Sequence, residues 1–452
     1  MLLNERLMVH FCGLDFASPF GVGAIGAHWG KAEPDPVKFA EINGGILLKH
    51  AQAGAGFVIL NGMFLNDKAK DAILNRYSED ELIPEQQAHE QARMMPIRGK
   101  APYGVEGFYF VPSPFWPGIG MAGTADRNRE MVRMLKAKRP DNTPIVANVL
   151  GIADIPETFV SSATGWAELG VDMLEINVSC PLPVGQRDPV LRYETGRLHP
   201  FFQGVLVGDN LERVVEIVRQ VRAAVDLPIG VKLSPETGFP RIVQFAKACR
   251  DAGADFVTMF NAGVGLVPPD IYNGGRPMWP YMDKSPFCMA SGSFLRVACL
   301  RDTGGVARYV SGLGISASGG LVEPEHMIQA MMLGATLVQP CTGIIEQGRG
   351  LLRRTAKFMT QYCEEQGLRS IQDIIGIGVP YLADNEQVDM LPGKTHLHID
   401  HSKCIRCARC ADNVCQALYF KDGRLSVLEE RCAGCGGCII ACPQGALSLY
   451  CN

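Results

Sequence analysis

The sequence predicts an α/β protein, a (β/α)8 TIM barrel followed by a small α+β domain. Two observations support this prediction. Short apolar runs alternate with amphipathic stretches up to about residue 365, which is typical of βα units. Half of the 16 cysteines then lie in two short runs near the end of the chain. A length of 452 residues leaves room for two or three domains, so both predicted parts fit in one chain.

Eight apolar runs are candidate barrel strands, each bounded by Gly, Pro or polar residues. They cover residues 20–25, 56–60, 145–149, 173–177, 229–233, 256–260, 310–316 and 336–340. Amphipathic stretches such as 210–225 and 241–252 are predicted to be the helices between them. The segments AELGVDMLEI, RDAGADFVTM and MMLGATLVQP repeat one order: helix end, Gly, small residue and buried strand. Eight such units close into a barrel.

Two of the connections that follow strands are long. Residues 61–125 are rich in Pro, Gly and aromatic residues, and we expect a lid or a partner-contact surface there. Residues 178–208 form the second long connection, which we expect to close over the site. Both leave the carboxyl ends of strands, where barrels place their active sites. The basic residues of 127–139 are expected to lie on an exposed helix face rather than in a binding patch.

Composition sets the predicted domain boundaries. The barrel is expected over residues 1–366, and a Gly- and Pro-rich linker over 367–396. The small domain is expected over 397–452. The overall charge of −4 implies neither nucleic acid nor an anionic membrane surface as a partner. No run of 18 apolar residues or signal-peptide pattern is present, and the eight cysteines outside the two runs are scattered, so we expect a cytoplasmic protein with free thiols.

The two cysteine runs have the spacing of iron–sulfur ligands. The second run follows C-x2-C-x2-C-x3-C-P, the bacterial ferredoxin pattern, and the first repeats C-x2-C-x2-C before a fourth cysteine. In two-cluster ferredoxins the fourth cysteine of each run binds the other cluster. The predicted ligand sets are therefore Cys404, Cys407, Cys410 and Cys442 for one [4Fe–4S] cluster, and Cys432, Cys435, Cys438 and Cys415 for the other. Zinc knuckles or disulfides are the alternative, although neither run contains a histidine at ligand spacing.

Polar residues follow several of the predicted barrel strands. These are Asn148, the run Asn177 to Cys180, Lys232 and Asn261, with the Gly-rich segments SGG (318–320) and CTG (341–343) after the last two strands. Gly-rich backbone at these two strands is a common phosphate site in barrels. Each residue alone has a structural explanation, such as a helix cap or a turn. Together, at one barrel end and beside a cluster domain, they predict a phosphorylated redox cofactor.

The same motifs resemble a known family. ASPFGVGA, IVAN, EINVSCP, GVKLSP, VTMFN, SGSFLR, ASGG and GATLVQPCTG are similar to the FMN-binding barrel shared by dihydroorotate and dihydropyrimidine dehydrogenases. SIQDIIGIGVPYL and the two-cluster tail resemble the dihydropyrimidine dehydrogenase family in particular, as its C-terminal half or as the iron–sulfur subunit of the bacterial two-subunit enzyme. The resemblance covers nearly the whole chain except 61–125 and 181–208.

The resemblance implies FMN as the cofactor and assigns roles by position. The implied FMN-binding residues are Gly23, Ala24, Asn61, Asn148, Lys232, Gly292, Ser318, Gly319, Gly320, Cys341 and Thr342. The implied substrate-facing residues are Asn148, Asn177, Ser179 and Asn261, and the implied catalytic residues are Cys180, as general acid or base, with Ser179 and Lys232. A thiol is protonated at neutral pH, so it can protonate one carbon of a C=C bond while flavin delivers hydride to the other.

Two positions depart from the family pattern. Asn61 stands where the family usually has a lysine that contacts the flavin, and Ala262 stands where it usually has a threonine. Loss of a hydrogen-bonding group typically changes which ligand a site accepts. Three functions therefore remain open: a dihydropyrimidine-type reaction, the same chemistry on a non-pyrimidine substrate, and an electron-transfer subunit of a larger complex.

Partners follow from the same reasoning. No G-x-G-x-x-G sequence opens a helix after a strand, so an NAD(P) site is not evident in the chain. We expect electrons to come from an NAD(P)H-oxidising flavoprotein or a ferredoxin-type partner, and the protein to be a homo- or hetero-oligomer.

Overall fold

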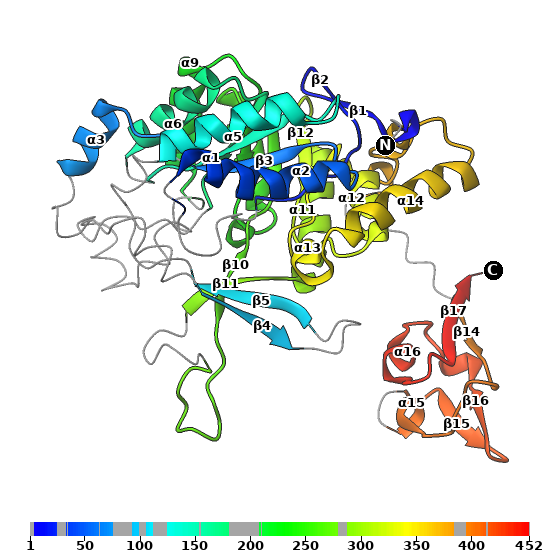
Figure 1. Cartoon of the computed structure of the whole chain (residues 1–452). Helices are drawn as coiled ribbons and strands as arrows, with labels where there is room; N and C mark the ends of the chain where they lie inside the picture. The colour runs from blue at the N-terminus through cyan, green and yellow to red at the C-terminus, as the bar shows by residue number, and fades with distance from the viewer. Residues whose placement is uncertain are drawn as a thin grey trace. The chain divides into compact units, whose positions relative to one another are not determined.

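The computed structural model describes residues 4–24, 33, 35–62, 64–75, 93–98, 105–111, 124–152, 155–179, 208, 210–278, 287–383, 395–412 and 415–451. The chain divides into two compact units, Met1–Leu382 and Ala383–Asn452, and Figure 1 shows the elements of each. The division falls inside the segment expected to be a linker.

The first unit is built on a seven-stranded parallel sheet. Its order is β13-β12-β9-β8-β7-β6-β3, so chain neighbours are sheet neighbours throughout. The strands are β3 (Val58–Gly62), β6 (Ile145–Val149), β7 (Met173–Asn177), β8 (Ile229–Lys232), β9 (Phe256–Met259), β12 (Gly314–Ala317) and β13 (Leu337–Val338). Each lies within or beside a predicted run. The predicted strand 310–316 begins later, since Val310 caps the preceding helix.

The segment around Phe20 closes this sheet into a barrel. Phe20 forms a parallel bridge with Val338 of β13, and the Gly21 N–H donates to the Val338 carbonyl at 3.1 Å. On its other side, the Gly56 N–H donates to the Phe20 carbonyl at 2.8 Å, just before β3 begins. The eighth position of the predicted barrel is therefore occupied by a short bridge segment, which confirms the TIM-like fold class.

Helices cover the outside of the barrel (Figure 1). Their bounds are α1 (Pro36–Phe39), α2 (Gly45–Gln52), α3 (Asp67–Leu74), α5 (Thr124–Lys138), α6 (Pro156–Glu168), α9 (Leu211–Ala224), α10 (Arg241–Asp251), α11 (Arg296–Tyr309), α12 (Pro324–Met332), α13 (Thr342–Gln347) and α14 (Gly350–Glu365). A π-helical turn, η2 (Ala40–Gly44), joins α1 to α2. Helix α9 has the amphipathic pattern predicted for these helices: its buried face consists of Val214, Ile217, Val218 and Val221.

An N-terminal hairpin plugs the end of the barrel at which the strands begin. Strands β1 (Val9–Phe11) and β2 (Leu14–Phe16) pair antiparallel. Phe11 packs edge-on against Phe256 at the start of β9, and Phe16 packs edge-on against Phe57, just before β3. Because this end is filled by aromatic side chains, only the opposite end, where the strands finish, is left for a site.

A second sheet lies at that opposite end (Figure 1). It is antiparallel, in the order β10-β11-β5-β4, with bounds β4 (Arg93–Arg98), β5 (Val105–Val111), β10 (Gly263–Leu266) and β11 (Phe287–Gly292). β5 pairs with β11 in the register Ala290↔Tyr109. The predicted insertion 61–125 therefore supplies two strands to a sheet completed by residues after β9.

Residues 367–382 belong to the first unit. The short helix η7 (Ile371–Ile374) buries Ile371 and Ile374 in the main core, and η8 (Val379–Tyr381) follows it. The first part of the segment expected to be a linker is thus packed against the barrel.

The second unit is a small α+β structure. β14 (Thr395–Ile399) pairs antiparallel with β17 (Leu447–Cys451), and β15 (Leu418–Lys421) pairs with β16 (Arg424–Val427). Two short helices, α15 (Arg409–Asp412) and α16 (Gly437–Ala441), pack on each other. In both units, no helix of the described residues is long and apolar enough to cross a membrane.

Candidate active site and cluster-binding unit

A chain of hydrogen-bonded amides crosses the open end of the barrel. Asn261 Nδ2 donates to Asn177 Oδ1 at 3.2 Å, and Asn177 Nδ2 donates to Asn148 Oδ1 at 3.1 Å. Asn148 Nδ2 then donates to Glu175 Oε1 at 2.8 Å. These residues come from β6, β7 and the end of β9, so parallel strands bring together three asparagines predicted separately. Asn61 on β3 is the register partner of Asn148 on β6.

Lys232 lies inside the barrel, beside these hydrogen-bonded asparagines. Its ammonium is 3.5 Å from Glu175 Oε1, and the side chains of both residues are buried. Burial by itself would raise the pKa of Glu175, but the Lys232 charge and hydrogen bonds from Gln339, Thr258 and Asn148 lower it below its ordinary value. Glu175 is therefore a buried carboxylate kept ionised by Lys232 and three donors.

Gly-rich backbone converges beside Thr342, the first residue of α13. Ser291 Oγ and Thr342 Oγ1 are 2.8 Å apart, which brings the end of β11 to α13. A Cβ on Gly320 would lie 2.5 Å from the Arg296 backbone nitrogen and 2.9 Å from the Gly292 carbonyl oxygen. We call Gly292, Gly320 and Thr342, which are thus gathered in one place, the glycine cluster.

The remaining predicted cofactor residues border the same region. The Gly23 N–H donates to the Pro340 carbonyl at 3.2 Å, and a Cβ on Gly23 would lie 3.3 Å from the Cys341 Cβ. Ala24 is partly buried against the main core, and Ser318 and Gly319 follow β12 directly. Burial raises the pKa of Cys341 to about 11, and the nearby Lys232 ammonium opposes this rise.

The residues at the carboxyl ends of the barrel strands, which form the mouth of the barrel, fit a polar cofactor. Ser179 Oγ and Gln339 Oε1 are buried without a hydrogen-bond partner among the described residues, although buried polar atoms are normally paired. A bound group with polar edges would satisfy them. Cys180 and the connection that follows it lie outside the described residues, so their prediction stays a prediction.

Sequence reasoning missed three residues of this site. Glu175, Thr258 and Gln339 are all at most 2% exposed, and together they complete the network around Lys232. A charged or polar residue inside an otherwise apolar strand, such as the glutamate of MLEIN, is the signal that would have found them.

In the second unit, four thiols line one small cavity. They are Cys404, Cys407, Cys410 and Cys442, the set predicted from the exchange of fourth ligands between the two runs. Burial raises the pKa of Cys410, with further contributions from Cys442, Cys404 and Cys407, so these thiols are electrostatic neighbours. Among the described residues, no group of three or more His, Cys, Asp or Glu side chains is placed to hold a single metal ion.

Three cysteines of the second set, Cys438, Cys415 and Cys432, are electrostatic neighbours. Burial raises the pKa of Cys438, and the nearby Cys415 of the other run adds to this rise. The fourth cysteines of the two runs have similar surroundings: the Ala417 N–H donates to Cys415 Sγ at 3.4 Å, and the Ala446 N–H to Cys442 Sγ at 3.2 Å. Hydrogen bonds to sulfur are one way in which a protein sets a cluster's potential.

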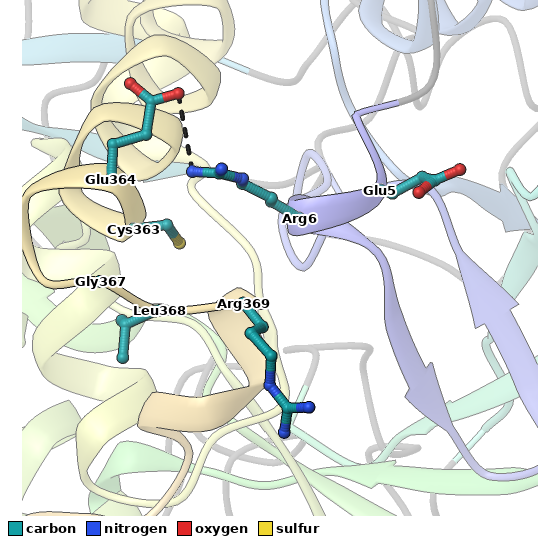
Figure 2. Close-up of a pocket in the computed structure, with 7 residues that line it drawn as sticks. All are labelled: Glu5, Arg6, Cys363, Glu364, Gly367, Leu368 and Arg369. Carbon is teal, nitrogen blue, oxygen red and sulfur yellow. Dashed lines mark ion pairs between the residues drawn. The ribbon is translucent and has the colours of Figure 1, made fainter.

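A further pocket in the first unit contains none of the predicted site residues. Figure 2 shows that it is lined by η1 (Glu5–Leu7) together with the end of α14 and the turn that follows. Arg6 extends toward Glu364, with an Nη1–Oε1 distance of 3.6 Å, while Arg369 points away from this pair. Both partners of the ion pair are substantially exposed, so the pocket adds nothing to the site at the mouth.

Comparisons with known proteins agree with this arrangement. The family model described as "4Fe-4S binding domain" matches residues 425–448. The chain carries a 4Fe-4S binding domain. It is also 26% identical over 288 residues to the NAD-dependent dihydropyrimidine dehydrogenase subunit PreA of Escherichia coli (strain K12), which covers 63% of this chain and 64% of that protein. The chain thus spans somewhat less than two thirds of the length of this relative.

Two other relatives are named as subunits of a dihydroorotate dehydrogenase. The chain is 27% identical over 238 residues to the catalytic subunit of dihydroorotate dehydrogenase B (NAD(+)) of Methanothermobacter thermautotrophicus, covering 52% of this chain and 69% of the relative. The corresponding subunit of Pyrococcus abyssi is 26% identical over 278 residues, covering 62% and 79%. The resemblance expected from the strand-end motifs is therefore confirmed.

Proposed function

We propose that the protein is an FMN- and iron–sulfur-dependent oxidoreductase that reduces, or in reverse forms, an activated C=C bond in a small cyclic substrate. The observation that carries this proposal is the convergence of the asparagine chain, the Lys232–Glu175 pair and the glycine cluster at one barrel end. Dehydrogenases of dihydropyrimidine and dihydroorotate among the relatives support the same class of reaction. A dihydropyrimidine-type reaction is the specific activity that we propose.

FMN fits the residues at the mouth. Gly292, Gly320 and Thr342 would hold its phosphate, since close backbone approach and a helix start suit an anion. Lys232 and Gln339 would face its polar ring edge, because both are buried beside the same carboxylate. When bound, FMN supplies hydride transfer.

The chain's own residues then orient the substrate and move one proton. Asn177 and Asn261 present amide groups that suit a cyclic substrate with C=O and N–H edges. Ser179, which precedes Cys180 in the chain, has a buried hydroxyl. We propose that hydride goes to one carbon of the C=C bond and that Cys180 gives its thiol proton to the other carbon.

Substitution of Cys180 tests this assignment. Cys180→Ser replaces the thiol by a hydroxyl of similar size that is a much weaker acid, so we expect FMN content to stay at the wild-type level while turnover falls by at least about 100-fold. Cys363→Ser, which changes a buried thiol on α14, is the matched control and should keep its turnover. Full activity in the Cys180 variant would remove this residue from the mechanism.

A second candidate, which Asn61 and Ala262 favour, is the same reaction on a substrate other than a pyrimidine. Asn61 is neutral and pairs in register with Asn148, so β3 places an amide where the resemblance implies a lysine. A screen of cyclic, conjugated carbonyl compounds against the reduced protein separates the two candidates. Oxidation by such a compound but not by uracil or thymine would favour the non-pyrimidine substrate.

We further propose that two [4Fe–4S] clusters deliver electrons from a separate NAD(P)H-oxidising flavoprotein or a ferredoxin-type carrier. Support comes from the two cysteine groups of the second unit and from the "NAD-dependent" and "subunit" names of the relatives. Gel filtration together with an assay of NADH oxidation tests this proposal. Full turnover from NADH by a single-chain species would contradict it.

A third possibility is that the barrel no longer transforms a substrate and the protein only transfers electrons within a larger complex. The intact asparagine chain argues against this reading. Turnover that requires co-purified catalytic protein would favour it.

A further inference from the structure

Glu175 joins four strands of the barrel through one carboxylate. It lies on β7 and is fully buried. Oε1 accepts from Asn148 Nδ2 of β6 at 2.8 Å and lies 3.5 Å from the Lys232 ammonium of β8. Oε2 accepts from Thr258 Oγ1 of β9 at 2.7 Å and from Gln339 Nε2, which follows β13, at 2.9 Å. The carboxylate is therefore the acceptor to which the polar groups of the mouth converge.

An ionised carboxylate only accepts hydrogen bonds, and this property sets the direction of the amide chain. Because Glu175 takes the Nδ2 of Asn148, the Oδ1 of Asn148 is left to accept from Asn177. Asn177 must then turn its own Oδ1 toward Asn261. The negative charge of Glu175 thus determines the direction in which the Oδ1 and the Nδ2 of each asparagine point.

Stability alone does not explain a buried ion pair of this kind. Replacing such a pair by apolar residues of similar volume is often neutral or stabilising, because the desolvation of two charges offsets their attraction. Lys232 is the last residue of β8, and its ammonium lies near Cys341, which directly precedes Thr342 in the chain. The position of the pair indicates a role at the site.

We propose that Glu175 is a positioning residue, which holds the Lys232 ammonium at the barrel mouth and fixes the orientation of the three amides. This inference rests on the proposed function in one respect, that FMN is the group Lys232 faces. The carboxylate also balances the charge of Lys232, so the reduced flavin is stabilised less than it would be by an uncompensated lysine.

Glu175→Gln tests the proposal in the full-length holoprotein. The glutamine is nearly isosteric, but it lacks the charge and presents an NH2 group to donors. Lys232 then becomes uncompensated, and we expect the FMN couple to shift at least tenfold toward the reduced form, which is about 30 mV for two electrons. The misdirected amides should raise the substrate KM and lower turnover by roughly 10- to 100-fold. Removing the lysine as well, in Glu175→Gln/Lys232→Met, should reverse the shift in potential.

A second buried carboxylate provides the control. Asp302 on α11 is fully buried and accepts from Arg301 Nε at 2.6 Å. Asp302→Asn should lower the unfolding temperature without changing the flavin potential. A Glu175→Gln protein with wild-type potential and KM would overturn the proposal. So would a loss of thermal stability alone, like that of the control, because it would indicate a purely structural role.

Failure of the proposed function is distinguishable from failure of this inference. If the wild-type protein binds FMN but reduces no pyrimidine, the potential measurement still tests Glu175. If it binds no flavin, thermal unfolding of Glu175→Gln, Lys232→Met and the double variant tests the interaction of the two residues directly. Non-additive shifts would support the coupling of Glu175 to Lys232, and additive shifts would overturn it.

Discussion

At the scale of single residues, the mouth leaves two polar atoms without partners. Ser179 Oγ and Gln339 Oε1 are buried and unpaired among the described residues, and each such atom typically costs about 1–3 kcal/mol. A ligand that donates to Gln339 and exchanges a hydrogen bond with Ser179 would recover this cost on binding. We therefore expect a bound ligand to contact Ser179 and Gln339.

Glu346 on α13 should make stability depend on pH. Burial, and secondarily the charge of Glu323, raises its pKa from 4.5 to about 7. The folded state then holds the proton in a range where the unfolded state has released it, so this carboxyl contributes stability at low pH that is lost as the pH rises from about 4.5 to 7. We expect Glu346→Gln to remove this part of the pH dependence. Urea unfolding of both proteins at pH 5 and pH 8 measures it, and parallel pH profiles would contradict the assignment.

The sequence located the asparagines of the mouth but not the network that connects them. Strand-end position predicted Asn148, Asn177 and Asn261, because parallel strands finish at one barrel end. Thr258 and Gln339 remained hidden, since a polar residue in a buried strand is recognised only when its partner is known. Pairing across sequence separations as large as the 164 residues from Glu175 to Gln339 is a property of the closed barrel.

At the scale of elements, the glycine cluster depends on close backbone approach. Gly320 has a φ of +69°, and a Cβ there would meet the Arg296 nitrogen at 2.5 Å. We expect Gly320→Ala to weaken FMN binding at least tenfold, because the loop must move away from the start of α11. Flavin fluorescence titration measures the change.

Gly312→Ala is the matched control for this substitution. Gly312 has a similar φ of +71°, but a Cβ there would have no atom within 4 Å. The control therefore carries the backbone strain without the collision. Equal FMN affinities of the two variants would show that FMN binding does not depend on the close backbone approach at Gly320.

Most barrel strands followed from periodicity, whereas the sheet of β4, β5, β10 and β11 did not. Its strands β5 and β11 are as long as those of the barrel, but they lie more than 170 residues apart in the chain, with Tyr109 opposite Ala290. Neither partner has an apolar run long enough to be recognised alone. The first strand position was predicted, but it is a bridge at Phe20, since the chain there pairs only briefly on each side.

At the scale of the whole molecule, the chain joins a closed barrel to a separate cysteine-rich unit. The exchange of fourth ligands that we propose between the two cysteine runs would make each cluster depend on both runs. Cys442→Ser removes a thiol from the cavity that it shares with Cys404, Cys407 and Cys410. We expect anaerobically prepared protein to fall from about eight irons per chain to about four. Cys299→Ser, a buried barrel thiol, should leave the iron content unchanged.

The cluster unit was the part most completely predicted, because ligand spacing is fixed by the cluster itself rather than by distant contacts. Its cross-run grouping followed from the ferredoxin pattern and agrees with the cavity lined by Cys404 and Cys442. The substrate could not be predicted in the same way. We expect specificity to depend on Asn61, Ala262 and Cys180, because a single side chain can decide which ligand a site accepts.

We propose that this barrel end holds a flavin that exchanges hydride with a cyclic C=C bond. The most direct measurement is to photoreduce the anaerobic holoprotein and follow the flavin absorbance after uracil or thymine is added. We predict rapid reoxidation by at least one of them, with formation of its 5,6-dihydro product. A flavin that stays reduced both after uracil and after thymine is added would contradict the pyrimidine assignment. A purified protein with no flavin would contradict the proposal that the barrel binds FMN.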